Sequence, residues 1–238
     1  MIECFVYDMV FALSGESEQT NAEDGRLDKL KLRVVSATGY LLPLLASFPP
    51  LMGWAGLMTL PFALFLLIMA GRLPEIHVSL PYLFFGGNVF DIMLMLSGLG
   101  LLIASVAYLR SRKSEGLVAS GPYMVVRHPQ YFGIILFTAA MTSRSIWILT
   151  HTFGMGWLTT YHTLVVWYAM LLAYIGLALI EELHLSKTHP QEWGSYRERV
   201  GFLFPLANSR HRILEVFVPI LVLGLMMYGL AVYSTWWT

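Results

Sequence analysis

One polar stretch organises this chain: Gly121-Pro122-Tyr123-Met124-Val125-Val126-Arg127-His128-Pro129-Gln130-Tyr131. It lies between two long hydrophobic runs, and its Arg-His-Pro step ends a loop and opens the second run. A positive charge, an imidazole and a helix N-terminus therefore meet at one point. A second polar cluster, residues 181–199, follows the next hydrophobic run. Two such clusters, each at the end of a membrane helix, predict one active site at the bilayer surface.

The composition indicates an integral membrane protein. Hydrophobic residues make up 57% of the 238 residues and charged residues 13%, whereas soluble domains carry about 25% charged residues. Several runs approach the roughly 20 residues that a helix needs to cross a bilayer. Backbone groups in lipid must pair internally, and the sequence shows no alternating barrel pattern. The predicted fold class is therefore all-α: a polytopic transmembrane helical bundle of about six membrane helices, with the active site at the cytosolic helix ends.

The predicted organisation has three parts. An N-terminal leader, expected to be partly disordered, covers residues 1–33; a membrane core covers 34–212; an additional C-terminal transmembrane helix covers 213–238. Residues around His77 are predicted to form an external loop. The six hydrophobic runs are about 34–48, 51–70, 88–109, 129–149, 156–183 and 213–236.

Individual residues within these runs carry local predictions. Asn88 is expected to cap the third run, with Asp91 in its first turn. Arg144 is expected to snorkel to the opposite interface. Four glycines are expected to permit close helix contact rather than to bind a ligand. They are Gly53, Gly56, Gly98 and Gly100.

The distribution of charge predicts an orientation and excludes some partners. If the two polar clusters share a side, that side holds nine of the 15 Lys and Arg residues, which places it in the cytoplasm. The predicted location is multi-pass in a prokaryotic plasma membrane or the endoplasmic reticulum. A net charge of zero argues against a nucleic-acid partner. The single cysteine, Cys4, excludes a Cys-based zinc site, and no histidine spacing predicts a metal.

The start of the fourth run is suited to an anion. Pro129 fits the first helical position, where its missing N–H costs no hydrogen bond. His128 is then the cap, and the free N–H groups of the first turn attract an anion or a carboxylate. Arg127 would add a fixed positive charge. The alternative is a positively charged flank that binds no ligand.

The pair Glu181-Glu182 ends the fifth run, where negative charge at a helix C-terminus costs up to about 1 kcal/mol. Adjacent residues point about 100° apart, so at most one is expected to face the bundle interior. A carboxylate placed there needs a cationic partner: Arg127, Arg199 or a cationic ligand. The alternative is a solvated pair at the interface.

The segment after the glutamates is expected to lie over the site. Tyr196 and Arg199 are three residues apart and become neighbours if this segment is helical. They could then hold a carboxylate or an aromatic ring over the site. An amphipathic interfacial helix, with Trp193 and Phe202 dipping into lipid, is a compatible alternative.

These residues together resemble the isoprenylcysteine carboxyl methyltransferase family and its wider relatives, the phospholipid N-methyltransferases and the methanethiol S-methyltransferases. The resemblance covers about residues 88–205, with its motifs in the family's order and spacing. Gly201 stands where family members often have Pro, and Trp193 where many have Tyr. The matching motifs are Gly121-Pro122-Tyr123, Arg127-His128-Pro129-Gln130-Tyr131, Glu181-Glu182, Tyr196, Arg199-Val200 and Phe204-Pro205.

The resemblance implies that S-adenosylmethionine binds at the cytosolic helix ends, under the segment after the glutamates. It implies catalytic roles for Arg127, Glu181 and Arg199. The cofactor-binding residues that it implies are Tyr123, His128, Pro129, Tyr131, Glu181, Glu182 and Tyr196.

The favoured acceptor is an amphipathic or lipid-linked molecule with a carboxylate of the isoprenylcysteine type, since this group is already ionised and an arginine can hold it. A phospholipid amine would need a base such as Glu181 or His128, and a small thiol would need positive surroundings. Two other classes are a sterol-type membrane reductase, which would bind a nicotinamide cofactor, and a catalytically silent membrane scaffold.

Overall fold

The computed structural model describes residues 50–71, 76–112, 116–151, 159–204 and 212–236. The contacts divide the chain into two compact units, residues 1–60 and 61–238, and each is described by itself. The predicted leader over 1–33 and the first hydrophobic run over 34–48 lie outside the described residues.

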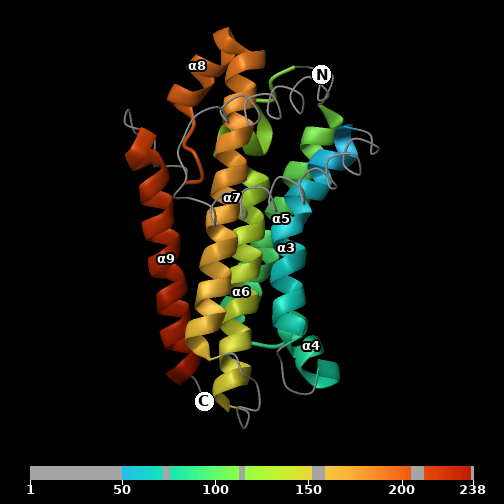
Figure 1. The fold of residues 1–238 in the computed structure, drawn as a ribbon, viewed down its shortest axis with the longest axis vertical. Helices are drawn as coiled ribbons and strands as arrows, with labels where there is room; N and C mark the ends of the chain where they lie inside the picture. Colours follow the sequence, from blue (N-terminus) through green and yellow to red (C-terminus); the bar gives the residue numbers. More distant parts are fainter. Residues whose placement is uncertain (1–49, 72–75, 113–115, 152–158, 205–211, 237–238) are drawn as a thin grey trace, which may run out of the picture. The chain divides into compact units, whose positions relative to one another are not determined.

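The described residues form helices with no named strand (Figure 1). Four helices (α5, α6, α7 and α9) are long and apolar enough to cross a membrane, and α3 contains a shorter apolar helix, Gly56–Ala70. This confirms a helical fold suited to a membrane, while the count of six spans stays a prediction. The helices are α3 (Pro50–Ala70), α4 (Ile76–Phe85), α5 (Val89–Ser111), the 3-10 turn η2 (Gly121–Met124), α6 (Pro129–His151), α7 (Thr160–Thr188), α8 (Pro190–Arg199) and α9 (Arg212–Trp236).

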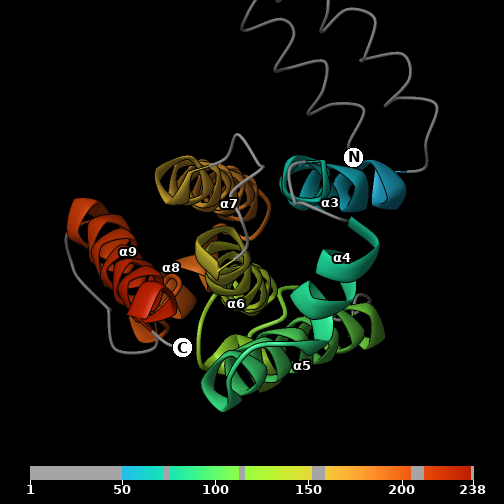
Figure 2. The ribbon, with the colours of Figure 1, turned by 90° about the horizontal axis from the view of Figure 1, so that it is seen from below.

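Helix α6 is the centre of the second unit. It packs against α4, α5, α7 and α9, and Figure 2 shows it among α5, α7 and α9. In the most apolar stretch of α6, 78% of the residues are buried, whereas in that of α5 only 11% are. Helix α5 instead exposes large apolar side chains such as Phe90, Met93 and Ile103. Exposed apolar surface of this extent is expected to face lipid.

The helix starts follow local sequence signals. The Asn88 side chain accepts a hydrogen bond of 2.8 Å from the Asp91 N–H, which confirms the predicted cap of α5. Helix α6 begins at Pro129 as predicted, and the His128 carbonyl accepts from the Phe132 N–H at 3.0 Å. The loop prediction around His77 is wrong, because Ile76–Phe85 forms α4.

Helices α5 and α6 are in close contact at two glycines, Gly98 and Gly133. A Cβ added to Gly98 would lie 2.5 Å from the Phe137 nitrogen and 2.7 Å from the Gly133 carbonyl oxygen. The predicted close contact is therefore confirmed at Gly98. Among the described residues, a Cβ added to Gly56 or Gly100 meets no atom within 4 Å, so the close contact is not confirmed at these two positions. The surroundings of Gly53 lie outside the described residues.

This contact makes a matched pair of substitutions informative. We expect Gly98→Ala to lower the stability of the purified protein by about 1–3 kcal/mol, because the new methyl group meets backbone that cannot move aside. Gly100→Ala, two residues along the same helix, should be neutral or slightly stabilising, since alanine favours a helix. Thermal unfolding in detergent measures both. Equal melting temperatures for the two variants would contradict the close contact.

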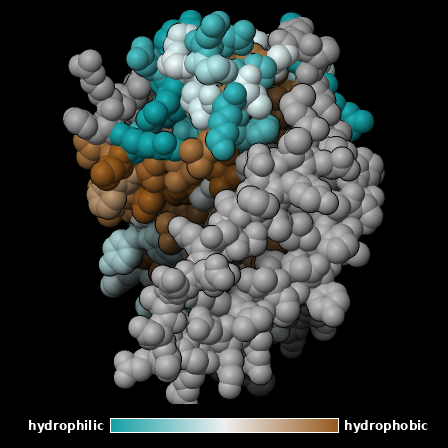
Figure 3. All heavy atoms as spheres, turned by 45° about the horizontal axis from the view of Figure 1, so that its top comes forward, coloured by the Kyte–Doolittle hydropathy of each residue, from teal (hydrophilic) through white to brown (hydrophobic). Residues whose placement is uncertain are grey.

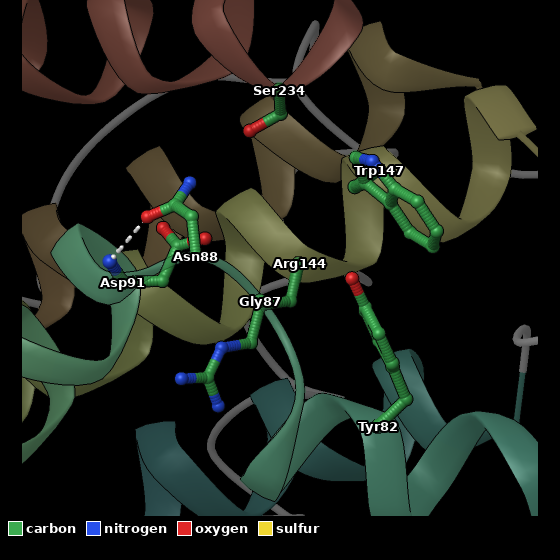
Figure 4. Close-up of a pocket in the computed structure, with 7 residues that line it drawn as sticks. All are labelled: Tyr82, Gly87, Asn88, Asp91, Arg144, Trp147 and Ser234. Carbon is green, nitrogen blue, oxygen red and sulfur yellow. Dashed lines mark hydrogen bonds between the residues drawn. The ribbon is translucent and has the colours of Figure 1, made fainter. Parts of the chain in front are cut away.

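The prediction for Arg144 is wrong, because its side chain does not snorkel to an interface but is fully buried. It reaches from α6 toward the turn between α4 and α5 (Figure 4). One terminal nitrogen donates to the carbonyls of Leu83 and Phe84 at 2.9 and 2.8 Å. Carbonyls in the last turn of a helix have no partner within the helix. Arg144 therefore turns inward because unpaired acceptors at the end of α4 lie within its reach.

A small polar cavity surrounds this arginine. Its volume is about 10 Å³, roughly the size that holds one water molecule. The Asp91 carboxylate is buried within electrostatic range of Arg144. Figure 4 shows the lining residues, which are Tyr82, Gly87, Asn88, Asp91, Arg144, Trp147 and Ser234.

Candidate functional site

Hydrophilic residues gather at the end of the second unit where α8 lies, next to a band of hydrophobic residues (Figure 3). At this end α6 begins, α7 ends and α9 begins (Figure 1). Side chains from α7, α8 and α9 and from the loop before α6 form a largely buried group that we call the charged cluster. Its members are Arg127, His128, Glu181, Glu182, Arg197 and Glu215.

Arg127 binds two carboxylates from different helices. One terminal nitrogen lies 2.9 Å from Glu182 of α7. The other contacts Glu215 of α9. The second oxygen of Glu215 accepts from Arg197 of α8 at 3.2 Å. Arg127, Glu182 and Glu215 are almost completely buried, whereas the Arg197 side chain is 32% exposed.

His128 lies between the two adjacent glutamates. Its Nδ1 is 3.3 Å from Glu181 and its Nε2 is 3.5 Å from Glu182. The prediction that at most one glutamate would face the interior is wrong, because both carboxylates reach this buried ring. Glu182 is the deeper one, with 4% of its side chain exposed against 20% for Glu181.

Burial and neighbouring charges act on these cations in opposite directions. Burial by itself would lower the pKa of the His128 imidazolium, but the carboxylates of Glu181 and Glu182 outweigh it, so the pKa is raised. The two carboxylates therefore favour the protonated form of the ring. Burial lowers the pKa of the Arg127 guanidinium, and Glu182 opposes that effect.

Backbone contacts hold the loop before α6 against the segment after α8. The Arg127 N–H donates to the Gly201 carbonyl at 2.9 Å, beside an isolated bridge between Val126 and Gly201. The Arg127 guanidinium lies 5.9 Å from the Trp193 ring centre and 5.6 Å from that of Phe202. Cation–π contacts of this kind stabilise a desolvated guanidinium.

Helix α8 is held by its apolar inner face. Trp193, Tyr196 and Val200 form a buried group, and the Tyr196 hydroxyl donates to the Tyr123 carbonyl at 2.7 Å. Burial raises the pKa of both Tyr123 and Tyr196. Both phenols therefore stay neutral near pH 7.

Two polar side chains next to the charged cluster have unused hydrogen-bonding capacity. Both amide atoms of Gln130 and the hydroxyl of Tyr131 are buried without a hydrogen-bond partner among the described residues. The Tyr131 ring stacks on His128 with centres 5.6 Å apart, and its hydroxyl lies near Glu181. Buried polar atoms are normally paired, so these atoms are candidates to pair with a ligand or a water molecule.

The structure brings together most of the residues that the sequence singled out. Arg127 and His128 contact the Glu181-Glu182 pair directly. The others, Tyr123, Pro129, Tyr131 and Tyr196, are buried at the same end of the unit.

Arg199 is not brought into the cluster, which corrects its predicted position. Its side chain is exposed, and its Nε donates to the Ser195 carbonyl at 3.0 Å. Arg199 is the last residue of α8, and its guanidinium turns back along the helix to Ser195 instead of reaching the cluster. Arg197 is the arginine of α8 that reaches the cluster.

The sequence analysis missed Glu215, Arg197 and Gln130. For Glu215 a signal was present, since it is a carboxylate within a run apolar enough to cross a membrane, where acidic residues are rare. Arg197 differs from Arg199 only by its rotation about α8.

Comparison of the chain with protein-family models, curated proteins and solved structures finds no match.

Proposed function

We propose that the chain is an integral membrane methyltransferase that uses S-adenosylmethionine, similar to the isoprenylcysteine carboxyl methyltransferases. The observation that carries this proposal is the placement of His128 between two carboxylates at the polar end of an apolar helix bundle. Gln130 and Tyr131 follow His128 in the chain, in the first turn of α6, and carry buried polar atoms without a hydrogen-bond partner among the described residues. A polar ligand would find charged groups there, while an acceptor with a hydrocarbon chain would keep that chain in lipid.

The chemistry of these side chains fits the cofactor. Glu181 and Glu182 suit positive charge, and the free N–H groups of the first turn of α6 suit a carboxylate. The Gln130 amide and the Tyr131 hydroxyl offer unused donors and acceptors. When bound, the cofactor supplies a methyl group on a positively charged sulfur.

The protein's own contribution would be mainly to orient the reacting groups and to exclude water. Trp193 and Phe202 cover Arg127 with aromatic surface, which keeps the charged cluster in a medium of low dielectric constant. For an acceptor that must lose a proton, Glu181 is the candidate base, because it is the more exposed of the two glutamates.

The proposed acceptor is an amphipathic molecule with a carboxylate of the isoprenylcysteine type. Arg197 is a cation that such a carboxylate could reach, since it is 32% exposed, whereas Arg127 is buried and already binds two carboxylates. Because Arg127 is already paired with two carboxylates, a phospholipid amine is a second candidate acceptor, since its positive charge suits the glutamates.

Calorimetric titration of the detergent-purified protein with S-adenosylhomocysteine tests the methyltransferase function. We expect binding, and we expect Glu181→Gln to weaken it about 10-fold to 100-fold, since hydrogen bonds to charged groups contribute about 1.5–3 kcal/mol. Glu192→Gln makes the same chemical change at an exposed position of α8 and should leave the affinity unchanged.

NADPH, titrated in parallel, separates the methyltransferase from a reductase. Binding of NADPH without S-adenosylhomocysteine would favour the reductase. If folded protein binds neither compound, the proposed function is wrong. Once binding is established, methyl transfer to a prenylated cysteine and to phosphatidylethanolamine distinguishes the two acceptors.

A further inference from the structure

Residues of alternating charge form one continuous series of contacts through the charged cluster. It begins on the half-exposed surface of α8, passes through α9 and the loop before α6, and ends on α7 (Figure 1). Each neighbour in it is a contact of opposite charge when His128 is protonated. The order is Arg197, Glu215, Arg127, Glu182, His128, Glu181.

Glu215 is the residue that the last helix, α9, contributes to this series of charges. It lies in the first turn of α9, is 2% exposed, and binds arginines from two other segments. The N-terminus of a helix stabilises a carboxylate there. A carboxylate that only anchored α9 would need one cation, whereas Glu215 lies between Arg127 and Arg197.

We propose that Glu215 is a positioning residue of the candidate site: it holds one side of the Arg127 guanidinium and thereby sets how strongly Glu182 holds the His128 ring. Its role in methyl transfer rests on the proposed function. The coupling through Arg127 rests on the described contacts alone.

The expected electrostatic effects have opposite signs for the two partners of Glu215. Without the Glu215 charge, the positive charge of Arg127 is less compensated, so it attracts Glu182 and disfavours a second cation on His128. His128 then loses its proton at lower pH. Without the Arg197 charge, Glu215 compensates Arg127 more fully, and His128 keeps its proton to higher pH.

The other groups that face His128 stay the same in both variants. Glu181 and Glu182 face the ring from α7 and Tyr131 stacks on it from α6. Phe202 contacts the ring edge, and Arg127 precedes it in the chain. Farther out, Tyr123 and Tyr196 are neutral, and Arg212 lies within electrostatic range of Arg127.

Nuclear magnetic resonance of protein with ¹³C-labelled histidine measures this coupling directly. The His128 signal is assigned by its loss in His128→Gln, and its titration is followed with pH. We expect Glu215→Gln to lower the midpoint and Arg197→Gln to raise it, each by about 0.5–1 in pH, because Glu215 and Arg197 are unit charges three and four contacts from His128. Glu192→Gln, at an exposed site on α8, should not move it.

Opposite shifts support the proposal, because a general loosening of the site would move both midpoints in the same direction. Shifts of the same sign, or no shift, overturn it. If Glu215→Gln does not fold, the shift in Arg197→Gln tests the proposal by itself. The Arg197 side chain is 32% exposed, so its replacement should leave the fold intact. Affinity for S-adenosylhomocysteine is measured on the same samples. Opposite shifts without any binding would remove the proposed function but keep the role of Glu215.

Discussion

Replacing Arg127 with methionine is expected to cause a loss of about 3–5 kcal/mol in the free energy of unfolding, because it leaves the carboxylates of Glu182 and Glu215 buried without their shared cation. For a chain of this length such a loss corresponds to a melting temperature roughly 6–20 °C lower. Thermal unfolding in detergent, followed by the fluorescence of the seven tryptophans, measures it.

Two comparisons isolate the cause of this loss. Arg199→Met makes the same change at an exposed position and should alter stability by no more than about 0.5 kcal/mol. Adding Glu215→Gln to Arg127→Met removes one of the stranded charges and should recover part of the loss. An Arg127→Met protein as stable as the unchanged chain would show that the two carboxylates do not depend on this guanidinium.

Replacing Arg144 with methionine is expected to be similarly damaging, at about 3–5 kcal/mol. The side chain is fully buried and donates to two carbonyls at the end of α4, with the buried Asp91 carboxylate nearby. Its loss would leave those acceptors unpaired inside an apolar bundle. Helix α4 should lose its attachment to α6, which faster hydrogen exchange over residues 76–87 would reveal.

A double substitution tests the coupling between Arg144 and Asp91. Asp91→Asn combined with Arg144→Met should be less harmful than the sum of the two single changes, by about 1–3 kcal/mol. Arg110→Met, at an exposed position in the last turn of α5, serves as the control and should be nearly neutral. Strict additivity of Asp91→Asn and Arg144→Met would contradict an electrostatic link between them.

Both arginines act on the same helix, since Arg127 lies just before the start of α6 and Arg144 lies near its far end. Each is retained in apolar surroundings by acceptors that come from other elements. Helix α6 therefore connects the charged cluster to the polar cavity at the opposite end.

The sequence by itself determined the features that depend on near neighbours. An apolar run of about 20 residues can satisfy its backbone in lipid only as a helix, so α5, α6 and α9 lie within a few residues of their predicted bounds. Asn88 and Pro129 set helix starts through contacts within one turn. The convergence of Arg127-His128 with Glu181-Glu182 was also predictable, since buried carboxylates need cations.

Only the tertiary structure decided which other charged residues join the Arg127-His128 and Glu181-Glu182 pairs. Glu215 lies 88 residues from Arg127 along the chain, and the neighbouring sequence does not predict how α9 is rotated about its own axis. The choice of Arg197 over Arg199, and the inward turn of Arg144, likewise depend on where unpaired acceptors lie in space. A long cationic side chain binds the nearest acceptor that burial has left without water, and the packing of helices distant in sequence determines where that acceptor is.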